Sequence, residues 1–412
     1  MKIFNLDMKN YIKSALVSFR YSRKLAKIKN GRKNRKVKIL FYVTENSKWG
    51  YQSLYEILAK DERFEVLVVV GVLNGVHKGK DRTRQNLEEN YNFFKSRGMN
   101  VEYGYRNNKF VSLKSFAPDV VFYEQPWELP RSHRPLNVSK FAVTCHCPYS
   151  FQLFKNMQDL YDKFYGLLYR YYLTHELNLK RIEKHIKTKA KNCDVVGYPK
   201  LDVYNKNKNI KNCWKHKDRI KIIYAPHHAL EKGSLRLSTF EENGKLILDW
   251  AKKHPEITWI FKPHPRLRYA LAHTGIMNEE EIESYYKEWE KLGVVYTQGD
   301  YFDIFKSSDL MITDCGSFLA EYLPTKKPLI RPINDDAIEL NEIGSLVASE
   351  YYQTRNNQEL LSVLEEVVVN KNDYKKDARL KIIDEFFDYE ESSAFKIYKG
   401  LLRDFGMEKN ND

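Results

Sequence analysis

The stretch Thr258-Trp259-Ile260-Phe261-Lys262-Pro263-His264-Pro265-Arg266 contains the pattern that decides the fold of this chain. It begins as a short apolar strand and becomes a polar turn at Lys262. The two prolines exclude a helix and hold the backbone extended, so Lys262, His264 and Arg266 are expected to share one face. Such a rigid group of donors at a strand end predicts an anion-binding site. The alternative is a surface turn whose charges are only solvated.

Apolar strands alternate with helices on both sides of this stretch. Strands are expected at residues 37–43, 64–73, 119–123, 141–145 and 194–198, and again at 221–225, 258–261, 294–297, 310–313 and 328–331. Continuous apolar strands separated by helices are typical of a parallel sheet covered on both faces. We therefore expect an α/β fold of two doubly wound, Rossmann-like domains that face a cleft, with ligands at the carboxyl ends of the strands.

The length of 412 residues is more than one ordinary core accommodates. A Lys- and Asn-rich region at 205–217 is interpreted as a linker. We predict a basic amphipathic segment over 1–35, a first Rossmann-like domain over 36–204 and a second over 218–390. Residues 391–412 are predicted to form a helix that crosses back to the first domain.

The N-terminal segment has the periodicity of an amphipathic helix, with Met8, Ile12, Leu16 and Phe19 on one stripe and basic residues around it. One interpretation is a helix that lies on an anionic lipid surface. The other is a helix packed on the protein with a solvated basic face. Periodicity does not decide between them.

The formal net charge of +15 favours an anionic partner without identifying it. The five cysteines form no CxxC pair, so no metal site is predicted, and no cofactor either. Their scattered positions fit a reducing cytosol. No apolar run reaches the ~20 residues that span a bilayer, and no signal peptide is recognisable. We expect a cytoplasmic protein, free or attached to the inner face of the membrane.

A second candidate site follows the strand expected at 310–313. Asp314 can cap the next helix, Gly316 lets a phosphate approach the backbone, and the Ser317 hydroxyl is a further donor. Glu321 lies one turn later and is a candidate for the hydroxyls of a ribose. The alternative is an ordinary strand-to-helix turn with a capping Asp.

Three more histidines follow predicted strands. His146 ends the strand expected at 141–145, where a neutral imidazole can take a proton from a hydroxyl; a structural histidine bonded to backbone is the alternative. His227 and His228 follow Tyr224-Ala225-Pro226 and are predicted to line the cleft beside the anion site. Their spacing is not that of a helical metal site, and two solvated loop histidines are the alternative.

These motifs resemble the CDP-glycerol glycerophosphotransferases of teichoic-acid and capsule synthesis, a family with a GT-B-like fold. The residues that carry the resemblance are Val196-Gly197-Tyr198-Pro199, Tyr224-Ala225-Pro226, Lys262-Pro263-His264-Pro265, and the segment from Ile312 through Ser317 to Glu321. The match is good from about 194 to 332 and weak in the first half.

The resemblance implies roles for two histidines. His146 stands where the family has the histidine of a Trp-His-Gly segment that is proposed to activate the acceptor hydroxyl, although Cys145 and Cys147 replace its neighbours. His264 matches the His-Pro histidine that contacts the donor diphosphate. The family's Asp-Tyr-Ser-Ser turn is here Asp314-Cys315-Gly316-Ser317, with one hydroxyl fewer.

The resulting hypothesis is transfer of glycerol phosphate, or a similar polyol phosphate, from a CDP-activated donor. His146 would act as base, and the diphosphate would be held by Lys262, His264, Arg266, Asp314, Gly316 and Ser317. The acceptor would be a lipid-linked saccharide or a growing anionic polymer, with an anionic membrane surface as a further partner and no nucleic acid. A GT-B glycosyltransferase that uses a nucleotide sugar and a non-catalytic polyanion-binding protein are the alternatives.

Overall fold

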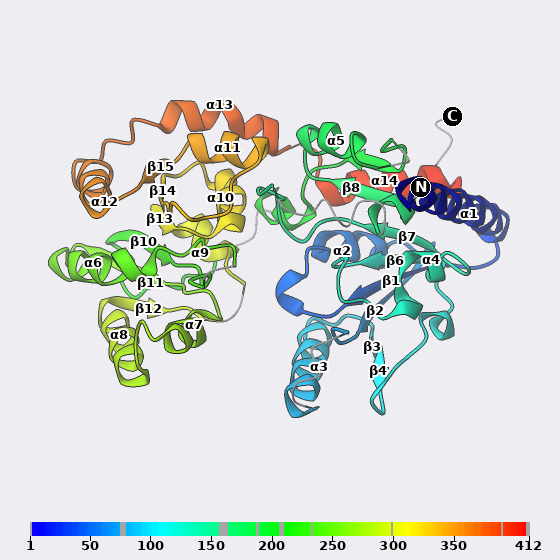
Figure 1. Ribbon diagram of the computed structural model, residues 1–412, viewed down its shortest axis with the longest axis horizontal. Helices are drawn as coiled ribbons and strands as arrows, with labels where there is room; N and C mark the ends of the chain where they lie inside the picture. The colour runs from blue at the N-terminus through cyan, green and yellow to red at the C-terminus, as the bar shows by residue number, and fades with distance from the viewer. Residues whose placement is uncertain are drawn as a thin grey trace. The chain divides into compact units, whose positions relative to one another are not determined.

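The computed structural model describes residues 2–74, 80–155, 164–186, 189–205, 210–231, 234–297, 300–388 and 390–408. The chain forms two compact units (Figure 1). Unit 1 combines Met1–Phe151, Asn156–Asn205 and Asp388–Asp412, and unit 2 combines Gln152–Lys155 with Lys206–Phe387. The C-terminal residues thus belong to the same unit as the N-terminus, and a short piece of the first half belongs to unit 2.

Unit 1 contains a 7-stranded sheet in the order β3-β2-β1-β6-β7-β8-β9, and every neighbouring pair is parallel. Its strands are β1 (Val37–Val43), β2 (Phe64–Val70), β3 (Val101–Tyr103), β6 (Val120–Tyr123), β7 (Val143–His146), β8 (Arg170–Leu173) and β9 (Cys193–Val195). A separate antiparallel pair joins β4 (Tyr105–Arg106) and β5 (Lys109–Phe110). The buried, apolar strands fit a parallel sheet that is covered on both faces.

Helices cover both faces of this sheet. They are α1 (Lys2–Gly31), α2 (Gln52–Lys60), α3 (Lys80–Lys95), α4 (Pro135–Val138), α5 (Glu176–Glu183) and α14 (Ser393–Phe405). Alternate residues of a strand point to opposite faces, so Phe41 packs in one core cluster with Leu54 of α2 and Leu401 of α14, whereas Leu40 packs in another with Ile182 of α5.

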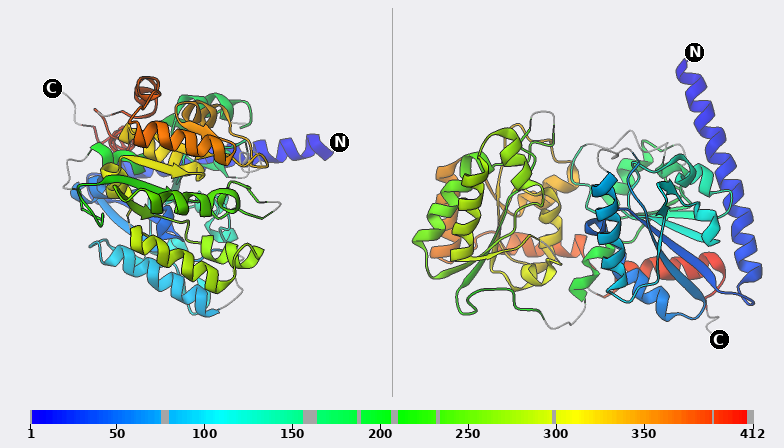
Figure 2. Two further views of the ribbon diagram at one scale, coloured as in Figure 1. Left: turned by 90° about the vertical axis from the view of Figure 1, so that its left-hand side faces the viewer. Right: turned by 90° about the horizontal axis from the view of Figure 1, so that it is seen from below.

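Helix α1 packs on unit 1 through a different face from the predicted apolar stripe. Val17, Tyr21 and Ile28 are buried. In contrast, Ile12 is 58% exposed and Phe19 is 61% exposed. Figure 2 shows the N-terminal end of the helix projecting beyond the rest of unit 1. Among the described residues, no helix combines the length and the hydrophobicity that crossing a membrane requires.

Unit 2 contains a 6-stranded parallel sheet in the order β12-β11-β10-β13-β14-β15. Its strands are β10 (Ile220–Ala225), β11 (Ile257–Phe261), β12 (Gly293–Val295), β13 (Leu310–Thr313), β14 (Leu329–Pro332) and β15 (Tyr352–Thr354). Its helices are α6 (Phe240–Lys253), α7 (Leu267–Thr274), α8 (Glu279–Leu292), α9 (Phe302–Ser307), α10 (Gly316–Tyr322), α11 (Glu342–Ser349), α12 (Asn357–Leu364) and α13 (Lys376–Phe386). This strand order is that of a doubly wound nucleotide-binding fold.

The register of the central strands brings the predicted site segments together. Tyr224 of β10 pairs with Phe261 of β11 on one side and with Ile312 of β13 on the other. The turns that follow these three strands therefore begin side by side at one edge of the sheet. Helices α6, α8 and α12 lie on one side of the sheet and α10 and α11 on the other (Figure 1).

Short 3-10 helices connect several of these elements. They span Asn46–Lys48, Leu113–Phe116, Arg131–His133, Tyr165–Leu167, Pro199–Asn205 and Leu323–Thr325. A π-helical turn, Glu365–Val369, continues α12.

Candidate functional site

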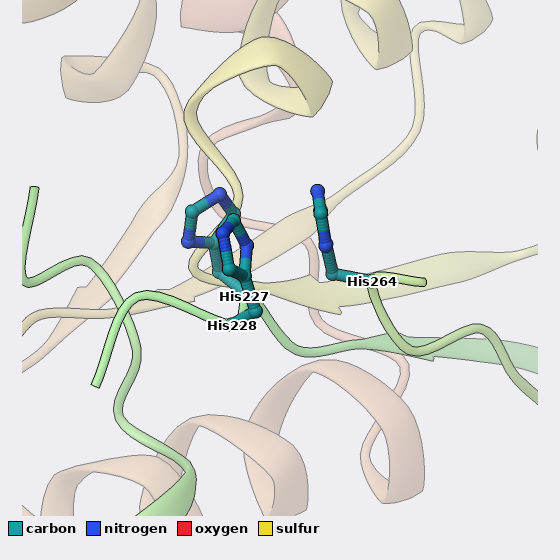
Figure 3. Close-up of side chains that lie close together, drawn as sticks. All are labelled: His227, His228 and His264. Carbon is teal, nitrogen blue, oxygen red and sulfur yellow. The ribbon is translucent and has the colours of Figure 1, made fainter. Parts of the chain in front are cut away.

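Three histidines meet at the carboxyl ends of β10 and β11 in unit 2 (Figure 3). The two turns that carry them are joined by backbone bonds, because Lys262 N–H donates to the Tyr224 carbonyl at 2.8 Å and His264 N–H donates to the Pro226 carbonyl at 3.0 Å. These bonds extend the pairing of the strands beyond their ends. They place His264 directly opposite the residues that follow Pro226.

The imidazole rings of this cluster, His227, His228 and His264, lie against one another. The rings of His228 and His264 stack with centroids 3.9 Å apart, and the His227 ring lies 4.4 Å from His228 and 5.1 Å from His264. One ring nitrogen from each residue lies within 4.8 Å of the others. The cluster therefore presents three imidazole edges to one small volume.

The backbone determines which nitrogen of two of these rings carries the proton. His227 Nδ1 accepts the N–H of Ala229 at 3.1 Å. His264 Nδ1 accepts the N–H of Arg266 at 3.1 Å. A neutral imidazole whose Nδ1 is an acceptor carries its proton on Nε2. His227 and His264 are thus hydrogen-bond donors at Nε2, while His228 Nδ1 is buried without a hydrogen-bond partner.

The cluster is uncharged at neutral pH although cations flank it. Burial lowers the pKa of His227 to about 3, of His228 to about 4 and of His264 to about 2. Repulsion between the rings, and from Lys262 and Arg266, lowers the pKa of His264 further. The negative charge of a bound anion would offset both the burial of the rings and the repulsion from their neighbours. The arrangement, N–H donors beside two permanent cations, is suited to a phosphate or diphosphate.

The same rings are less well arranged for a metal ion. A metal lies in the plane of each imidazole that binds it, on the lone pair of an unprotonated nitrogen. The planes of His228 and His264 are only 23° apart, so their lone pairs do not converge at bonding distance. Moreover, the Nε2 atoms of His227 and His264 carry protons in the neutral state described above.

Asp314 organises this site from within the protein. Its buried carboxylate accepts the His227 N–H at 2.6 Å, and it accepts the N–H and the hydroxyl of Thr239 at 2.7 and 2.9 Å. Burial raises the pKa of Asp314 to about 6, although the hydrogen bonds from His227 and Thr239 act in the opposite direction. This differs from the predicted contact with a diphosphate, because the oxygens are already used to hold two loops together and a carboxylate repels phosphate.

Gly316 begins α10, and its role differs from the predicted one. A Cβ atom at Gly316 would lie 2.4 Å from the Phe154 ring, so the side chain of Phe154 fills the space that was expected to admit a phosphate. Phe154 belongs to the segment Gln152–Lys155, which unit 2 takes from the first half of the chain. The Ser317 hydroxyl lies 3.4 Å from Cys315 Sγ at the same helix start.

Lys262 and Glu321 are linked through an aromatic side chain. Lys262 Nζ lies 4.9 Å from the ring centroid of Tyr301 and 5.3 Å from that of Phe318. The Tyr301 hydroxyl donates a hydrogen bond to the Glu321 carboxylate, which is buried. Arg266 is exposed. The structure thus puts Lys262, Arg266 and His264 on one turn, while Glu321 lies inside unit 2.

His146 lies in unit 1, at the end of β7. Its Nδ1–H donates to the Tyr123 carbonyl at 2.9 Å, which leaves Nε2 as the unprotonated nitrogen. The side chain is 1% exposed and its ring lies 5.6 to 5.8 Å from those of Phe164, Tyr165 and Tyr171. Burial lowers the pKa of His146 to about 4. The tautomer is that of a base, but the ring is enclosed.

A buried carboxylate that the sequence motifs did not identify lies at the carboxyl end of the unit 1 sheet. Glu124 follows β6, whose last residue pairs with His146, and it is 2% exposed. Its Oε2 accepts the N–H of Thr44 at 2.8 Å and that of Glu45 at 3.3 Å. Its Oε1 is buried with no hydrogen-bond partner. The rule that ligands bind at the carboxyl ends of parallel strands, applied to residues 119–123, would have identified it.

Solved structures share the fold of this chain at low sequence identity. A Staphylococcus aureus MnaA–UDP structure has a TM-score of 0.56 and 13% identity over 91% of this chain and 99% of that one. A UDP-N-acetylglucosamine 2-epimerase has a TM-score of 0.60 and 12% identity over 92% and 98%. The UDP-GlcNAc 2-epimerase of Methanocaldococcus jannaschii has a TM-score of 0.56 and 16% identity over 89% and 99%. The fold is therefore GT-B-like, as predicted.

A family model identifies the chain more closely. The model of the CDP-Glycerol:Poly(glycerophosphate) glycerophosphotransferases matches residues 172–402, a region that contains the histidine cluster, Asp314 and α10. No curated protein sequence matches the chain. Since the matched region covers more than half of the chain, this protein is a transferase and belongs to the CDP-glycerol:poly(glycerophosphate) glycerophosphotransferase family.

Proposed function

We propose that this transferase moves glycerol phosphate, or a similar polyol phosphate, from a CDP-activated donor to a hydroxyl group of a teichoic-acid or capsule polymer or of a lipid-linked saccharide. The observation that carries the proposal is the cluster of His227, His228 and His264, with Nε2–H donors on two rings and the cations Lys262 and Arg266 beside them. A diphosphate is the anion that such an arrangement would recognise in a CDP-linked donor.

The donor is held in unit 2. His264 Nε2–H, Lys262, Arg266 and the Ser317 hydroxyl bind the diphosphate, and Asp314 keeps the His227 turn in position. Phosphoryl transfer needs little covalent assistance, so positioning and charge stabilisation supply most of the acceleration. Negative charge builds up on the departing CMP, and these donors are proposed to stabilise it. Glu321 is proposed to act on the ribose, in a state in which its bond to Tyr301 is exchanged for the nucleotide.

The acceptor hydroxyl must lose a proton as it attacks. The family resemblance assigns this proton to His146, whose Nε2 has the free lone pair that a base needs. A base role also requires access to the hydroxyl, and the His146 ring and the Glu124 carboxylate are both almost completely buried. His146 is one candidate for the base, and Glu124 is a second.

An anionic membrane surface is proposed as a further partner, at the inner face of the cell membrane. Helix α1 has exposed apolar side chains at Tyr11, Ile12, Leu16 and Phe19. Exposed basic residues accompany them at Lys13, Arg23, Lys27, Lys29, Lys33 and Lys36. A helix with apolar and cationic side chains exposed together is suited to the interface of an anionic bilayer, where a lipid-linked acceptor would be found.

Calorimetry with a panel of nucleotide donors tests the donor assignment. We expect CDP-glycerol or another CDP-polyol to bind, and His264→Asn to weaken that binding at least about tenfold, because Asn loses the Nε2–H donor. His273→Ala, at an exposed histidine of the same unit, is the matched control and should bind as the wild type does.

Transfer of label from CDP-glycerol to a poly(glycerophosphate) primer completes the test. Binding of a nucleotide sugar in place of any CDP-polyol would support a glycosyltransferase instead. Salt-sensitive binding of oligonucleotides without affinity for any nucleotide donor would support a polyanion-binding protein.

A further inference from the structure

We propose that the carboxyl end of the unit 1 sheet binds the acceptor hydroxyl and that Glu124 accepts its proton. This inference rests on the proposed function, since it concerns the second substrate of the same transfer. It assigns a catalytic role to a residue outside the region matched by the family model.

The geometry of Glu124 is that of a held carboxylate with one oxygen available. Its Oε2 is fixed at the end of β1 by the backbone N–H groups of Thr44 and Glu45. Its Oε1 has no partner although the residue is almost completely buried. A buried carboxylate oxygen without a hydrogen bond is unfavourable and rare in native proteins, so it indicates a missing partner.

Two other polar atoms nearby lack partners as well. The hydroxyls of Tyr42 and Thr44, both at the end of β1, are buried without a hydrogen bond. Tyr42 is close enough to Glu124 for the carboxylate to contribute to its raised pKa. A hydroxyl-bearing ligand fits such a group, because its O–H can donate to Glu124 Oε1 while its oxygen accepts from a protein hydroxyl.

The surrounding side chains suit a polyol phosphate. Lys48 Nζ donates to Gln125 Oε1 at 2.6 Å, and it lies 5.6 Å from the ring centroid of Trp127 and 5.4 Å from that of Tyr149. Aromatic rings with a few fixed polar groups are typical of small-molecule sites. The Lys48 ammonium also pairs with the Glu45 carboxylate at 2.9 Å, and a bound phosphate would exchange for that carboxylate. An acceptor of alternating polyol and phosphate groups offers hydroxyl groups to the polar side chains and a phosphate to the ammonium group.

The proton and electron pairs balance in the proposed step. The acceptor O–H bond breaks and its proton goes to Glu124 Oε1. The acceptor oxygen forms a bond to the phosphorus that carries the polyol. The bond from that phosphorus to the bridging oxygen of the diphosphate breaks, and CMP leaves with the electron pair. Glu124 then releases its proton to solvent before the next cycle.

The basicity of Glu124 is suited to this step. Burial raises the pKa of Glu124 to about 8, while Lys48 and the two backbone N–H groups lower it. Burial lowers the pKa of His146 to about 4, which makes that ring a weak base at neutral pH. The titratable groups that face Glu124 are Lys48 and Glu45, together with the tyrosines Tyr42, Tyr51 and Tyr149.

The test compares Glu124→Gln with the wild type in transfer from CDP-glycerol to a poly(glycerophosphate) primer. We expect kcat to fall by about 10²- to 10⁴-fold while the Kd of CDP-glycerol stays unchanged. Glu65→Gln, at an exposed glutamate on β2, is the matched control and should keep the wild-type kcat. Wild-type kcat should rise with pH up to about 8, and this rise should be absent in Glu124→Gln.

Chemical rescue separates a base from a structural residue. In Glu124→Ala, added formate should restore part of kcat, because a small carboxylate can occupy the vacated position. If the Gln and Ala variants do not fold, Glu124→Asp replaces them and should lower kcat without changing the Kd of CDP-glycerol. A wild-type kcat in Glu124→Gln or Glu124→Asp overturns the role of Glu124 and leaves the proposed function intact. A wild type that neither binds nor uses CDP-glycerol overturns both.

Discussion

At the scale of single residues, the position of one proton separates two kinds of histidine in this enzyme. His264 and His227 accept backbone N–H groups at Nδ1 and so donate from Nε2, as an anion site requires. His146 donates from Nδ1 to a carbonyl and so keeps a lone pair on Nε2. The same side chain is thus prepared for opposite tasks by the backbone atom that it contacts.

Replacement of His146 by Asn tests whether that lone pair is used in catalysis. Asn can keep the bond to the Tyr123 carbonyl but removes Nε2 and part of the ring stacking. We expect the free energy of unfolding to fall by about 1–3 kcal/mol, while kcat per folded molecule stays within about threefold of the wild-type value. Denaturant unfolding and transfer rates on the same samples measure both quantities. A kcat loss above about a hundredfold would assign the base to His146 instead of Glu124.

The contact between Gly316 and Phe154 gives a second prediction at this scale. Gly316→Ala places a methyl group against the Phe154 ring and should destabilise the protein by about 1–3 kcal/mol. Phe154→Ala removes the ring, so the double variant should be no less stable than Phe154→Ala alone. A double-mutant cycle by denaturant unfolding measures this coupling, and additive effects would show that the two residues do not compete for the same space.

At the scale of secondary-structure elements, strand ends were predictable and side-chain partners were not. The apolar runs that end at Ala225, Phe261 and Thr313 are visible in the sequence, and parallel pairing then brings their ends to one edge. The roles of Asp314 and Gly316 depend on Thr239 and Phe154, which lie far away in the chain. No local pattern contains those contacts. Glu124 directly follows the strand expected at 119–123, so the rule for strand ends identifies its position, whereas its burial and its bonds depend on β1.

Helix α1 has two stripes of side chains at helical spacing, and periodicity does not show which of them packs on unit 1. The face that packs contains Val17, Tyr21, Lys24 and Ile28, at helical spacing, but two of these residues are polar. Tyr21 is buried and its hydroxyl bonds to Thr144, whereas Lys24 is half-buried and pairs with Asp119 at 2.9 Å. The more uniformly apolar stripe through Ile12, Leu16 and Phe19 is the exposed one. The sequence contains both stripes, and the contacts that α1 makes within unit 1 determine which one is buried.

The exposed stripe of α1 leads to a prediction about membrane binding. The double variant Ile12→Ser, Phe19→Ser should bind vesicles that contain anionic lipid at least about tenfold more weakly, because two apolar side chains no longer enter the interface. Its free energy of unfolding should change by less than about 1 kcal/mol, since both side chains are exposed. Vesicle sedimentation measures the binding.

Two controls accompany this measurement. Tyr269→Ser removes an exposed apolar side chain of unit 2 and should leave vesicle binding unchanged. Vesicles of zwitterionic lipid alone should bind the wild type weakly, because the exposed lysines and arginines of α1 then lose their partner. Equal binding of the wild type and the double variant to anionic vesicles would contradict a membrane role for this face.

At the scale of the whole molecule, buried neutral groups make stability depend on pH in two opposite directions. Burial lowers the pKa of five histidines below the ordinary value of 6.5: His133, His146, His227, His228 and His264. The unfolded chain takes up these protons before the folded protein does, so stability is lost as the pH falls below 6.5. Burial raises the pKa of Glu124 to about 8 and of Asp314 to about 6, so their contribution is lost as the pH rises.

The balance predicts a stability maximum near pH 6.5. Below it, each histidine contributes a loss of at most about 1.4 kcal/mol per pH unit, and less for the partly exposed His228 and His264. Above it, mainly Glu124 opposes folding, so the decline toward pH 8 should be shallower than the decline toward pH 4. Thermal unfolding between about pH 4 and 9 measures both arms. Glu124→Gln should flatten the alkaline arm and steepen the acid arm above about pH 4.5, because the contribution of Glu124 is lost between its ordinary pKa of 4.5 and about 8. His264→Asn should reduce the acid arm alone, whereas a maximum above pH 8 would show that these groups are charged in the folded protein.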